Sequence, residues 1–245
     1  MPQPSEDQLK AQYAEIAVLA GQLAHEIKNP LSTISLNMEL LREDLANTPE
    51  TPQTRRGQER IDRVRRECQR LEGLLNDFLS FARAQAGRME AVDMNQMIEE
   101  LLQFFHPQAE AAQVEVVQLL DPFVPAVAID REQMRASVLN LLINSVQAMP
   151  DGGRISVRTR RIGENLVLDL IDTGAGMDAQ TISQIFDPFF STKRGGSGLG
   201  LPAAKKIIET HGGTIRVQSE VGRGTQITIE LPPALEGPKL LEQRR

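Results

Sequence analysis

Residues 170–177 read Leu-Ile-Asp-Thr-Gly-Ala-Gly-Met. Leu166, Val167 and Leu168 precede them, so this stretch predicts a strand that ends near Asp172 and runs into a glycine turn. A carboxylate at the end of a strand can accept a hydrogen bond from an exocyclic amine. Gly174 and Gly176 would let a flat ring approach the backbone, because they carry no Cβ atom. Taken alone, the pattern is equally that of an ordinary glycine turn.

Asp93 and Asp130 can each cap a predicted helix, and a second polar pattern lies on the helix that follows Asp130. Residues 140–144 read Asn-Leu-Leu-Ile-Asn, and asparagines four positions apart share one face of a helix. Their carboxamide oxygens suit a hydrated Mg²⁺ and its phosphates, because Mg²⁺ prefers oxygen ligands. The alternative is a pair of exposed polar residues.

A glycine-rich run opens the next predicted helix. Residues 195–201 read Gly-Gly-Ser-Gly-Leu-Gly-Leu, and successive backbone N–H groups at a helix N-terminus form an anion site suited to phosphates. No βαβ unit surrounds the run, which argues against a dinucleotide-binding motif. Residues 186–193, Phe-Asp-Pro-Phe-Phe-Ser-Thr-Lys, combine aromatic anchors with a basic end. This composition is typical of a hinged lid in which Lys193 meets charge.

The rest of the chain divides into two regions, which together predict an α+β protein. Residues 8–86 indicate two long amphipathic helices joined by a turn-rich loop at residues 46–56. A hairpin of this kind leaves apolar surface exposed, and pairing two hairpins in a four-helix bundle buries it, so we expect a homodimer. Residues 89–232 mix helices with strands and predict a two-layer α/β sandwich. Residues 233–245 form a polar tail.

Composition limits the possible functions. The 245 residues carry a net charge of −6, with 4% aromatic residues and no Trp. A nucleic-acid partner is therefore not expected, since phosphate backbones select basic surfaces and bases stack on aromatic rings. No apolar run approaches the roughly 20 residues that span a bilayer, and the N-terminus lacks a signal-peptide layout. We expect a cytoplasmic chain without direct membrane contact, and the single cysteine, Cys68, fits a reducing compartment.

Taken in order, these motifs resemble the N, G1, F and G2 boxes of the GHKL ATPase superfamily, whose ATP-binding domain has the Bergerat fold. Residues 23–31, Leu-Ala-His-Glu-Ile-Lys-Asn-Pro-Leu, extend the resemblance to the sensor histidine kinases of two-component systems, which join a HisKA domain to this ATPase domain. The lid is similar to that of the nitrogen-regulator-type branch. The resemblance implies ATP and Mg²⁺ as cofactors, a homodimer, and the receiver domain of a response regulator as a partner.

The resemblance also implies roles for individual residues. Asn144 would coordinate Mg²⁺, with Asn140 on the same helix face, and Asp172 would bind the adenine amino group. The other implied nucleotide-binding residues lie in the glycine turn, the lid and the glycine-rich run: Gly174, Gly176, Phe189, Lys193, Gly196, Gly198, Leu199 and Gly200.

Asn140 also bears on where the phosphoryl group goes. Within the superfamily, gyrase B, MutL and the large heat-shock chaperone carry a glutamate one turn before the magnesium asparagine, where it activates water. A carboxamide at this position is a poor base. The resemblance therefore implies that the phosphoryl acceptor is a residue from elsewhere, and His25 is the expected acceptor.

Helical spacing places His25 on the outer face of its predicted helix. With Leu23 and Ile27 on the buried face, His25 lies roughly 160–200° away around the helix axis. Its imidazole offers a nucleophilic nitrogen, and Glu26 can orient the ring or accept its proton. Glu26 and Asn29 also fit the Glu-x-x-Asn pattern that this family links to phosphatase activity, in which Asn29 would position water.

Two other classes of function remain open at this point. An ATPase that uses nucleotide to drive conformational change is disfavoured by Asn140 and by the short chain. A dimeric scaffold with a vestigial ATP site is disfavoured because every motif is intact. The remaining histidines, His106 and His211, lack a comparable context and are expected to be structural.

Overall fold

The computed structural model describes residues 27–49, 51–82, 87–193 and 197–234. The chain divides into two compact units. The first comprises Met1–Arg83 and Ser191–Leu199, and the second comprises Ala84–Phe190 and Gly200–Arg245. Among the described helices, none has the length and apolar character that a membrane crossing requires.

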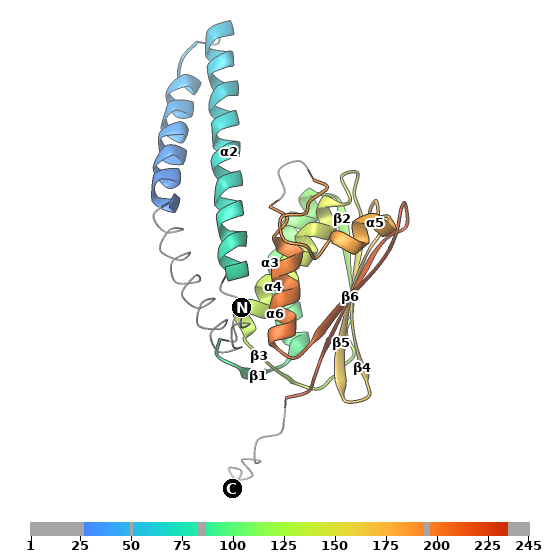
Figure 1. The fold of residues 1–245 in the computed structure, drawn as a ribbon. Helices are drawn as coiled ribbons and strands as arrows, with labels where there is room; N and C mark the ends of the chain where they lie inside the picture. The colour runs from blue at the N-terminus through green and yellow to red at the C-terminus, as the bar shows by residue number, and fades with distance from the viewer. Residues whose placement is uncertain (1–26, 50, 83–86, 194–196, 235–245) are drawn as a thin grey trace, which may run out of the picture. The chain divides into compact units, whose positions relative to one another are not determined.

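The first unit contains a helical hairpin (Figure 1). Its first helix is described over residues 27–46 and is followed by α2, Pro52–Ala82. The connecting loop is shorter than predicted because Pro52 takes the first helical position, where its missing N–H is not needed. The hydroxyls of Thr51 and Thr54 each accept a hydrogen bond from the other's backbone N–H, at 3.1 and 2.7 Å, and so cap the start of α2.

Contacts between the two helices hold the hairpin together. Glu39 on the first helix forms an ion pair with Arg65 on α2 at 2.8 Å. Leu31, Ile61 and Cys68 are buried. The predicted apolar stripe is nevertheless only partly covered within one chain. Its exposed members are Ile27, Ile34, Leu41, Val64, Leu71 and Phe78.

The second unit is built on a five-stranded sheet in the order β2-β4-β5-β7-β6. Its strands are β2 (Val114–Leu119), β4 (Gly153–Ile162), β5 (Asn165–Asp172), β6 (Thr214–Glu220) and β7 (Gly224–Leu231). Only the β2–β4 pair is parallel, and the other neighbouring strands are antiparallel. The sheet brings the C-terminal end of β5 beside the start of β7, where the candidate site lies.

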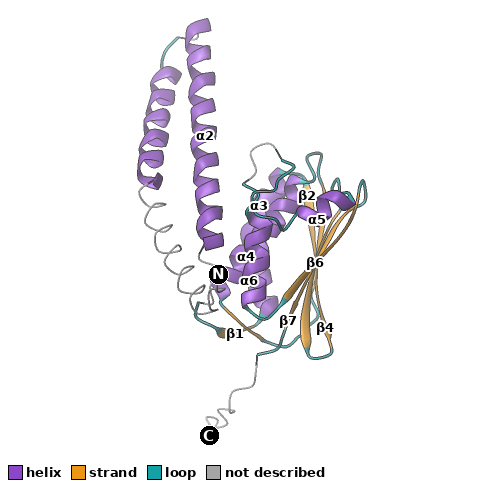
Figure 2. Ribbon diagram, viewed as in Figure 1, coloured by secondary structure: helices purple, strands orange, loops and turns teal. Residues whose placement is uncertain are grey.

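Three helices cover one face of this sheet: α3 (Met94–Ala111), α4 (Arg131–Gln147) and α6 (Gly200–Thr210), as Figure 2 shows. Their apolar sides and the inward residues of the strands form one continuous core. Asp93 and Asp130 cap α3 and α4 as predicted. The predicted two-layer α/β sandwich is confirmed.

Three short elements escaped prediction from the sequence. β1 (Glu90–Val92) pairs antiparallel with β3 (Val127–Ile129) in a separate two-stranded sheet, and α5 (Ala179–Gln184) follows the glycine turn. Segments of three to six residues contain too few apolar positions to display a period.

The opposite face of the sheet carries a carboxylate whose side chain is fully buried, Asp169 on β5. Arg158 and Arg160 donate to its Oδ2, each at 2.9 Å, while Gln226 and Thr228 donate to Oδ1 at 3.1 and 2.7 Å. Burial raises the pKa of Asp169, but the hydrogen bonds from Arg160, Thr228, Arg158 and Gln226 outweigh burial. They lower the pKa from its usual 3.8 to about 2. The carboxylate therefore links β5 to β4 through ion pairs and to β7 through hydrogen bonds.

Candidate functional site

Asp172 is the last residue of β5 and is only 5% exposed. Its Oδ1 accepts hydrogen bonds from the backbone N–H groups of Gly174 at 2.9 Å and Thr225 at 3.1 Å. Its Oδ2 accepts a hydrogen bond from the hydroxyl of Ser145 at 3.1 Å. A carboxylate offers about four lone-pair positions, so these three bonds leave one acceptor position, on Oδ2. A buried acceptor of this kind fits the amino group of a ligand.

The turn after Asp172 is fixed by backbone contacts on both sides. Ala175 N–H donates to the carbonyl of Ala148, just beyond α4, at 3.0 Å, and the Ala175 carbonyl accepts from Gly222 N–H at 2.7 Å. A Cβ on Gly174 would lie 2.9 Å from that of Ala148. The turn is therefore clamped between the end of α4 and the β6–β7 connection.

Gly176 shows why this turn requires glycine. Its φ is +67°, and a Cβ atom there would lie 2.0 Å from the carbonyl oxygen of Glu220. The missing side chains of Gly174 and Gly176 thus make room for protein atoms. Packing of protein atoms is therefore a physical reason for both glycines.

The two asparagines of α4 are half-buried and lie one helical turn apart. The start of α6 packs directly on Asn140, since a Cβ on Gly200 would lie 2.6 Å from Asn140 Nδ2. Within the described ranges, no cluster of three or more His, Cys, Asp or Glu side chains could hold a metal ion. Carboxamide oxygens such as that of Asn144 fit Mg²⁺, which keeps much of its coordination shell for water and substrate phosphates.

His211 links the C-terminal end of α6 to the N-terminal end of α4. The ring is 4% exposed, and its Nε2 accepts a hydrogen bond from the backbone N–H of Asp130, the capping residue of α4, at 2.9 Å. Nδ1 then carries the proton and donates to the Ile207 carbonyl at 2.7 Å. His211 is structural, as the sequence predicted, whereas His106 is exposed on α3.

The aromatic residues of the predicted lid differ in their surroundings. The ring of Phe186 packs against Lys205 of α6, with the ammonium nitrogen 5.1 Å from the ring centroid. Phe189 has a φ of +68° and is 72% exposed. Phe186 is therefore the anchor of this segment, while Phe189, the predicted nucleotide contact, projects into solvent. Lys193 is exposed and lies in a local turn in which its backbone N–H donates to Ser191 Oγ at 3.2 Å.

The glycine-rich run is described only in part, because Gly196 lies outside the described residues. Gly198 has a φ of +65°, and the backbone N–H of Leu199 donates to the Ser197 hydroxyl at 3.2 Å. Gly200 is the first residue of α6. These three residues form the N-terminal entry of that helix, as the sequence indicated.

Among the predicted residues of the hairpin, His25 and Glu26 lie outside the described residues. Asn29 lies in the first helix, is exposed, and accepts a hydrogen bond from Thr33 Oγ1 on its backbone carbonyl at 3.1 Å. Leu36 and Leu40 are 62% and 51% exposed. Spacings of seven and four residues place Asn29, Leu36 and Leu40 on one face of the helix.

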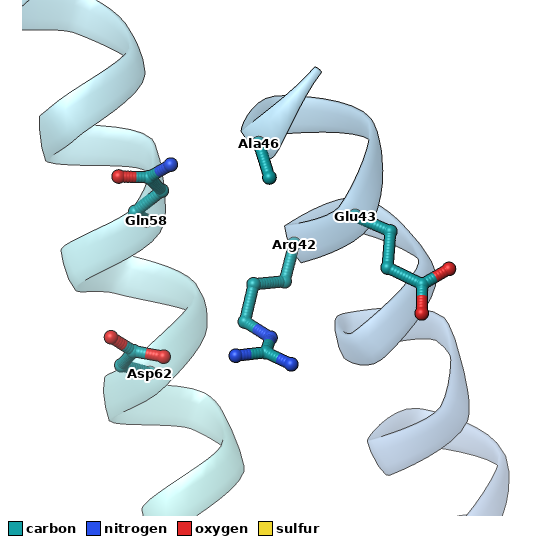
Figure 3. Close-up of a pocket in the computed structure, with 5 residues that line it drawn as sticks. All are labelled: Arg42, Glu43, Ala46, Gln58 and Asp62. Carbon is teal, nitrogen blue, oxygen red and sulfur yellow. The ribbon is translucent and has the colours of Figure 1, made fainter. Parts of the chain in front are cut away.

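A surface hollow of about 370 Å³ lies between the two helices of the hairpin. Figure 3 shows the guanidinium of Arg42 in the space between the helices and Glu43 turned away from it. The other lining residues are Ala46, Gln58 and Asp62. None of the residues predicted to bind nucleotide lines this charged hollow.

Sequence reasoning missed three hydroxyl residues around Asp172. Ser145 donates to its carboxylate, and Thr225 lies opposite Asp172 in the β5–β7 register. Ser219 Oγ accepts from Met177 N–H and lies 2.9 Å from Thr225 Oγ1, which ties the glycine turn to β6 and β7. The position of Ser145 directly after Asn144 was a sequence signal that could have pointed to this residue. Ser219 and Thr225 lie near Asp172 only because of strand pairing, which the sequence does not show.

Comparison with known proteins matches the two regions of the chain to two domain families. The HisKA family, the His Kinase A (phospho-acceptor) domain, matches residues 17–87. HATPase_c, the histidine kinase-, DNA gyrase B- and HSP90-like ATPase family, matches residues 129–235. The signal transduction histidine-protein kinase AtoS of Escherichia coli (strain K12) is 32% identical over 220 residues, which cover 89% of this chain and 35% of AtoS. The chain spans half or less of the length of the curated relatives AtoS, ZraS and sporulation kinase B.

Solved structures agree with this similarity. The mycobacterial sensor histidine kinase MprB is 32% identical, with a TM-score of 0.53, over 59% of this chain and 97% of the MprB chain. Full-length ShkA, in complex with AMPPNP, is 26% identical, with a TM-score of 0.69, over 87% of this chain and 45% of the ShkA chain. The chain belongs to the sensor histidine kinases, which combine a HisKA helical hairpin with an HATPase_c α/β domain.

Proposed function

We propose that the chain is an ATP-dependent protein kinase that phosphorylates itself on His25 and passes the phosphoryl group to an aspartate of a response regulator. The observation that carries the proposal is the Asp172 carboxylate, which is buried and has three of its acceptor positions filled. Its remaining acceptor suits the exocyclic amine of adenine. The complex of the related ShkA with AMPPNP supports an adenine nucleotide as the ligand of the chain.

The chemistry assigned to the phosphate end of the site rests on Asn140 and Asn144. Mg²⁺ held through Asn144 would neutralise charge on the phosphate oxygens. Asn140, packed against Gly200, is a carboxamide and cannot take a proton from water near neutral pH. The chain therefore supplies no hydrolytic base at this position, which favours transfer to a side chain.

In the proposed transfer, a ring nitrogen of His25 donates its lone pair to the γ-phosphorus. The N–P bond forms as the bond from this phosphorus to the bridging oxygen breaks, and ADP leaves. Glu26 orients the imidazole and accepts the proton of its other nitrogen. The product is phosphohistidine, whose N–P bond breaks when a regulator's aspartate takes the phosphoryl group.

A response-regulator receiver domain fits the outer face of the first helix. Asn29, Leu36 and Leu40 share this face, and helical spacing predicts His25 on it as well. Two exposed leucines on the face where the phosphoacceptor is predicted give a partner an apolar anchor. In a bound receiver, Asn29 would position water against the phosphoaspartate, which would add phosphatase activity.

The apolar stripe of the hairpin supports a homodimer. Ile34 and Leu41 remain 42% and 46% exposed although they continue the stripe of the buried Leu31. A second copy would cover them in a four-helix bundle. We also propose a cytoplasmic location for the chain, where ATP and receiver domains are present.

The test is to incubate the purified full chain with Mg²⁺ and γ-labelled ATP, and then to add a receiver domain. We expect acid-labile, base-stable label on the protein that moves to the receiver. Steady phosphate release without labelled protein would instead indicate an ATPase that drives conformational change. Absence of ATP binding would indicate a scaffold with a vestigial site.

A further inference from the structure

Ser145 connects the helix that carries the two asparagines to the carboxylate at the end of β5. The residue lies on α4 directly after Asn144 and is 4% exposed. Its hydroxyl donates to Asp172 Oδ2 at 3.1 Å, between two elements that are 27 positions apart in the chain. Both groups are buried, so the hydrogen bond is shielded from bulk solvent in the wild type.

A second buried serine on the same helix shows what Ser145 does differently. Ser137 is 3% exposed and donates its hydroxyl to the carbonyl of Gln133, four residues earlier, at 2.9 Å. This local bond is the ordinary solution for a serine inside a helix. Ser145 instead donates to the carboxylate of Asp172 on another element. The difference indicates a role at Asp172 rather than in the helix.

We propose that Ser145 is a positioning residue that sets the specificity of the nucleotide site for a 6-aminopurine over a 6-oxopurine. The proposal rests on the proposed function, in which Asp172 accepts the amino group of adenine. Because the Ser145 proton is committed to Oδ2, the pair offers a ligand only acceptors: one lone pair of Oδ2 and the oxygen of the hydroxyl. An amino group can donate hydrogen bonds to these acceptors. A 6-oxo oxygen is itself an acceptor, so it would face them with no proton between the oxygen atoms.

The rest of the Asp172 network reinforces this arrangement. The backbone N–H groups of Gly174 and Thr225 occupy both positions of Oδ1, so the carboxylate cannot rotate without breaking two bonds. Only Oδ2 is left for recognition, and Ser145 decides which of its lone pairs is available. In Ser145→Ala, a second lone pair becomes open and a water molecule can enter. Such a water can donate a proton to a 6-oxo group.

The test compares three nucleotides with four forms of the full chain. Binding of ATP, inosine triphosphate and purine riboside triphosphate, which lacks the 6-substituent, is titrated by calorimetry. The proteins are the wild type, Ser145→Ala, Ser145→Thr, which keeps the hydroxyl, and Ser137→Ala as the matched control. In parallel, the KM and kcat for self-phosphorylation are measured with ATP.

We expect Ser145→Ala to weaken ATP binding roughly 3- to 10-fold, the effect of losing one hydrogen bond. It should leave the affinity for purine riboside triphosphate nearly unchanged. The ratio of the affinities for ATP and inosine triphosphate should become smaller. KM for ATP should rise with kcat nearly constant, because the serine hydroxyl contacts the carboxylate proposed to bind the adenine amino group, so its loss should weaken binding of the ground state and the transition state alike. Ser145→Thr should restore the preference, and Ser137→Ala should keep it.

An equal loss for ATP and purine riboside triphosphate in Ser145→Ala would show a general structural role and overturn the proposal. An unchanged preference in this variant would do the same, while leaving Asp172 as the adenine acceptor. Failure of the wild type to bind ATP, or to distinguish ATP from purine riboside triphosphate, would instead overturn the proposed role of Asp172, and with it the role of Ser145.

Discussion

At the scale of single residues, nucleotide recognition depends on the direction in which the Asp172 carboxylate accepts hydrogen bonds. The residue is buried and already accepts three hydrogen bonds, so its free lone pair is held in one place by the protein. Preorganisation of this kind reduces the ordering cost of binding. The effect of a substitution should therefore fall on nucleotide affinity more than on folding.

Replacement of Asp172 by Asn tests this view. Asn keeps an acceptor for the N–H groups of Gly174 and Thr225 but places an NH₂ donor where Oδ2 faces Ser145. We expect ATP affinity to fall by about 1–3 kcal/mol, or roughly 5- to 150-fold, because donor would meet donor at the adenine amine. Calorimetric titration measures the loss, and Asp44→Asn on the exposed side of the first helix is the control. Unchanged affinity in Asp172→Asn would contradict the assignment.

At the scale of elements, the glycine turn after β5 is shaped by what packs on it. Gly176 and Gly163 both have a positive φ, at +67° and +59°. A Cβ on Gly176 would meet the Glu220 carbonyl at 2.0 Å, whereas around Gly163 nothing lies within 4 Å of such an atom. A substitution at Gly163 therefore introduces backbone strain alone, whereas a substitution at Gly176 introduces backbone strain and a steric collision together.

We expect Gly163→Ala to lower the free energy of unfolding by about 1–2 kcal/mol, the cost of a left-handed conformation for a non-glycine residue. Gly176→Ala should cost at least about 3 kcal/mol, since the collision adds to the same strain. Urea unfolding followed by circular dichroism gives both values. Equal losses in the two variants would mean that the β6–β7 connection moves away from the turn freely.

The network around Asp169 makes a prediction for the sheet. Asp169→Asn should lower the free energy of unfolding by about 2–3 kcal/mol near pH 7, because Arg158 and Arg160 lose their shared carboxylate. Since the pKa of Asp169 is lowered to about 2, its contribution is fully present above its usual pKa of 3.8 and is lost as the pH falls through about 2.

Urea titrations of the wild type and Asp169→Asn, repeated as the pH falls from about 7 towards 3, measure this dependence. The difference in the free energy of unfolding between them should shrink below about pH 4. A difference that stays constant over this range would show that the Asp169 carboxylate does not lose its ionic contribution there.

The sequence predicted the helices and long strands well because their periods and caps are local. Asp93 and Asp130 sit at the helix starts that they were expected to cap. The hydroxyl network was not predictable in the same way, because Thr225 reaches Asp172 only through the pairing of β5 with β7. Phe189 was placed in the lid by composition alone, which cannot tell it from the anchoring Phe186.

At the scale of the whole molecule, two faces of the first helix are assigned to different partners. Ile34 continues the stripe of the buried Leu31, whereas Leu36 lies with Asn29 roughly 160° around the helix from Ile34. Both side chains are exposed in one chain, at 42% and 62%. A charge placed on either face should therefore disrupt only one association.

We expect Ile34→Glu to convert the dimer to a monomer, because a carboxylate would be buried in the bundle. Leu36→Glu should keep the dimer and its self-phosphorylation but slow transfer to the receiver domain. Light scattering after size-exclusion chromatography measures the first outcome, and transfer of label measures the second. A dimeric Ile34→Glu variant would rule out this face as the dimer interface.

Transfer of a phosphoryl group to His25 is the central claim, and the three histidines of the chain allow a direct test. The wild type, His25→Gln and His106→Gln are incubated with Mg²⁺ and γ-labelled ATP, and label that is acid-labile and base-stable is counted on the protein. His106 is the matched control because it is exposed on α3. The account predicts label on the wild type and on His106→Gln, with none on His25→Gln. Undiminished label on His25→Gln would contradict it.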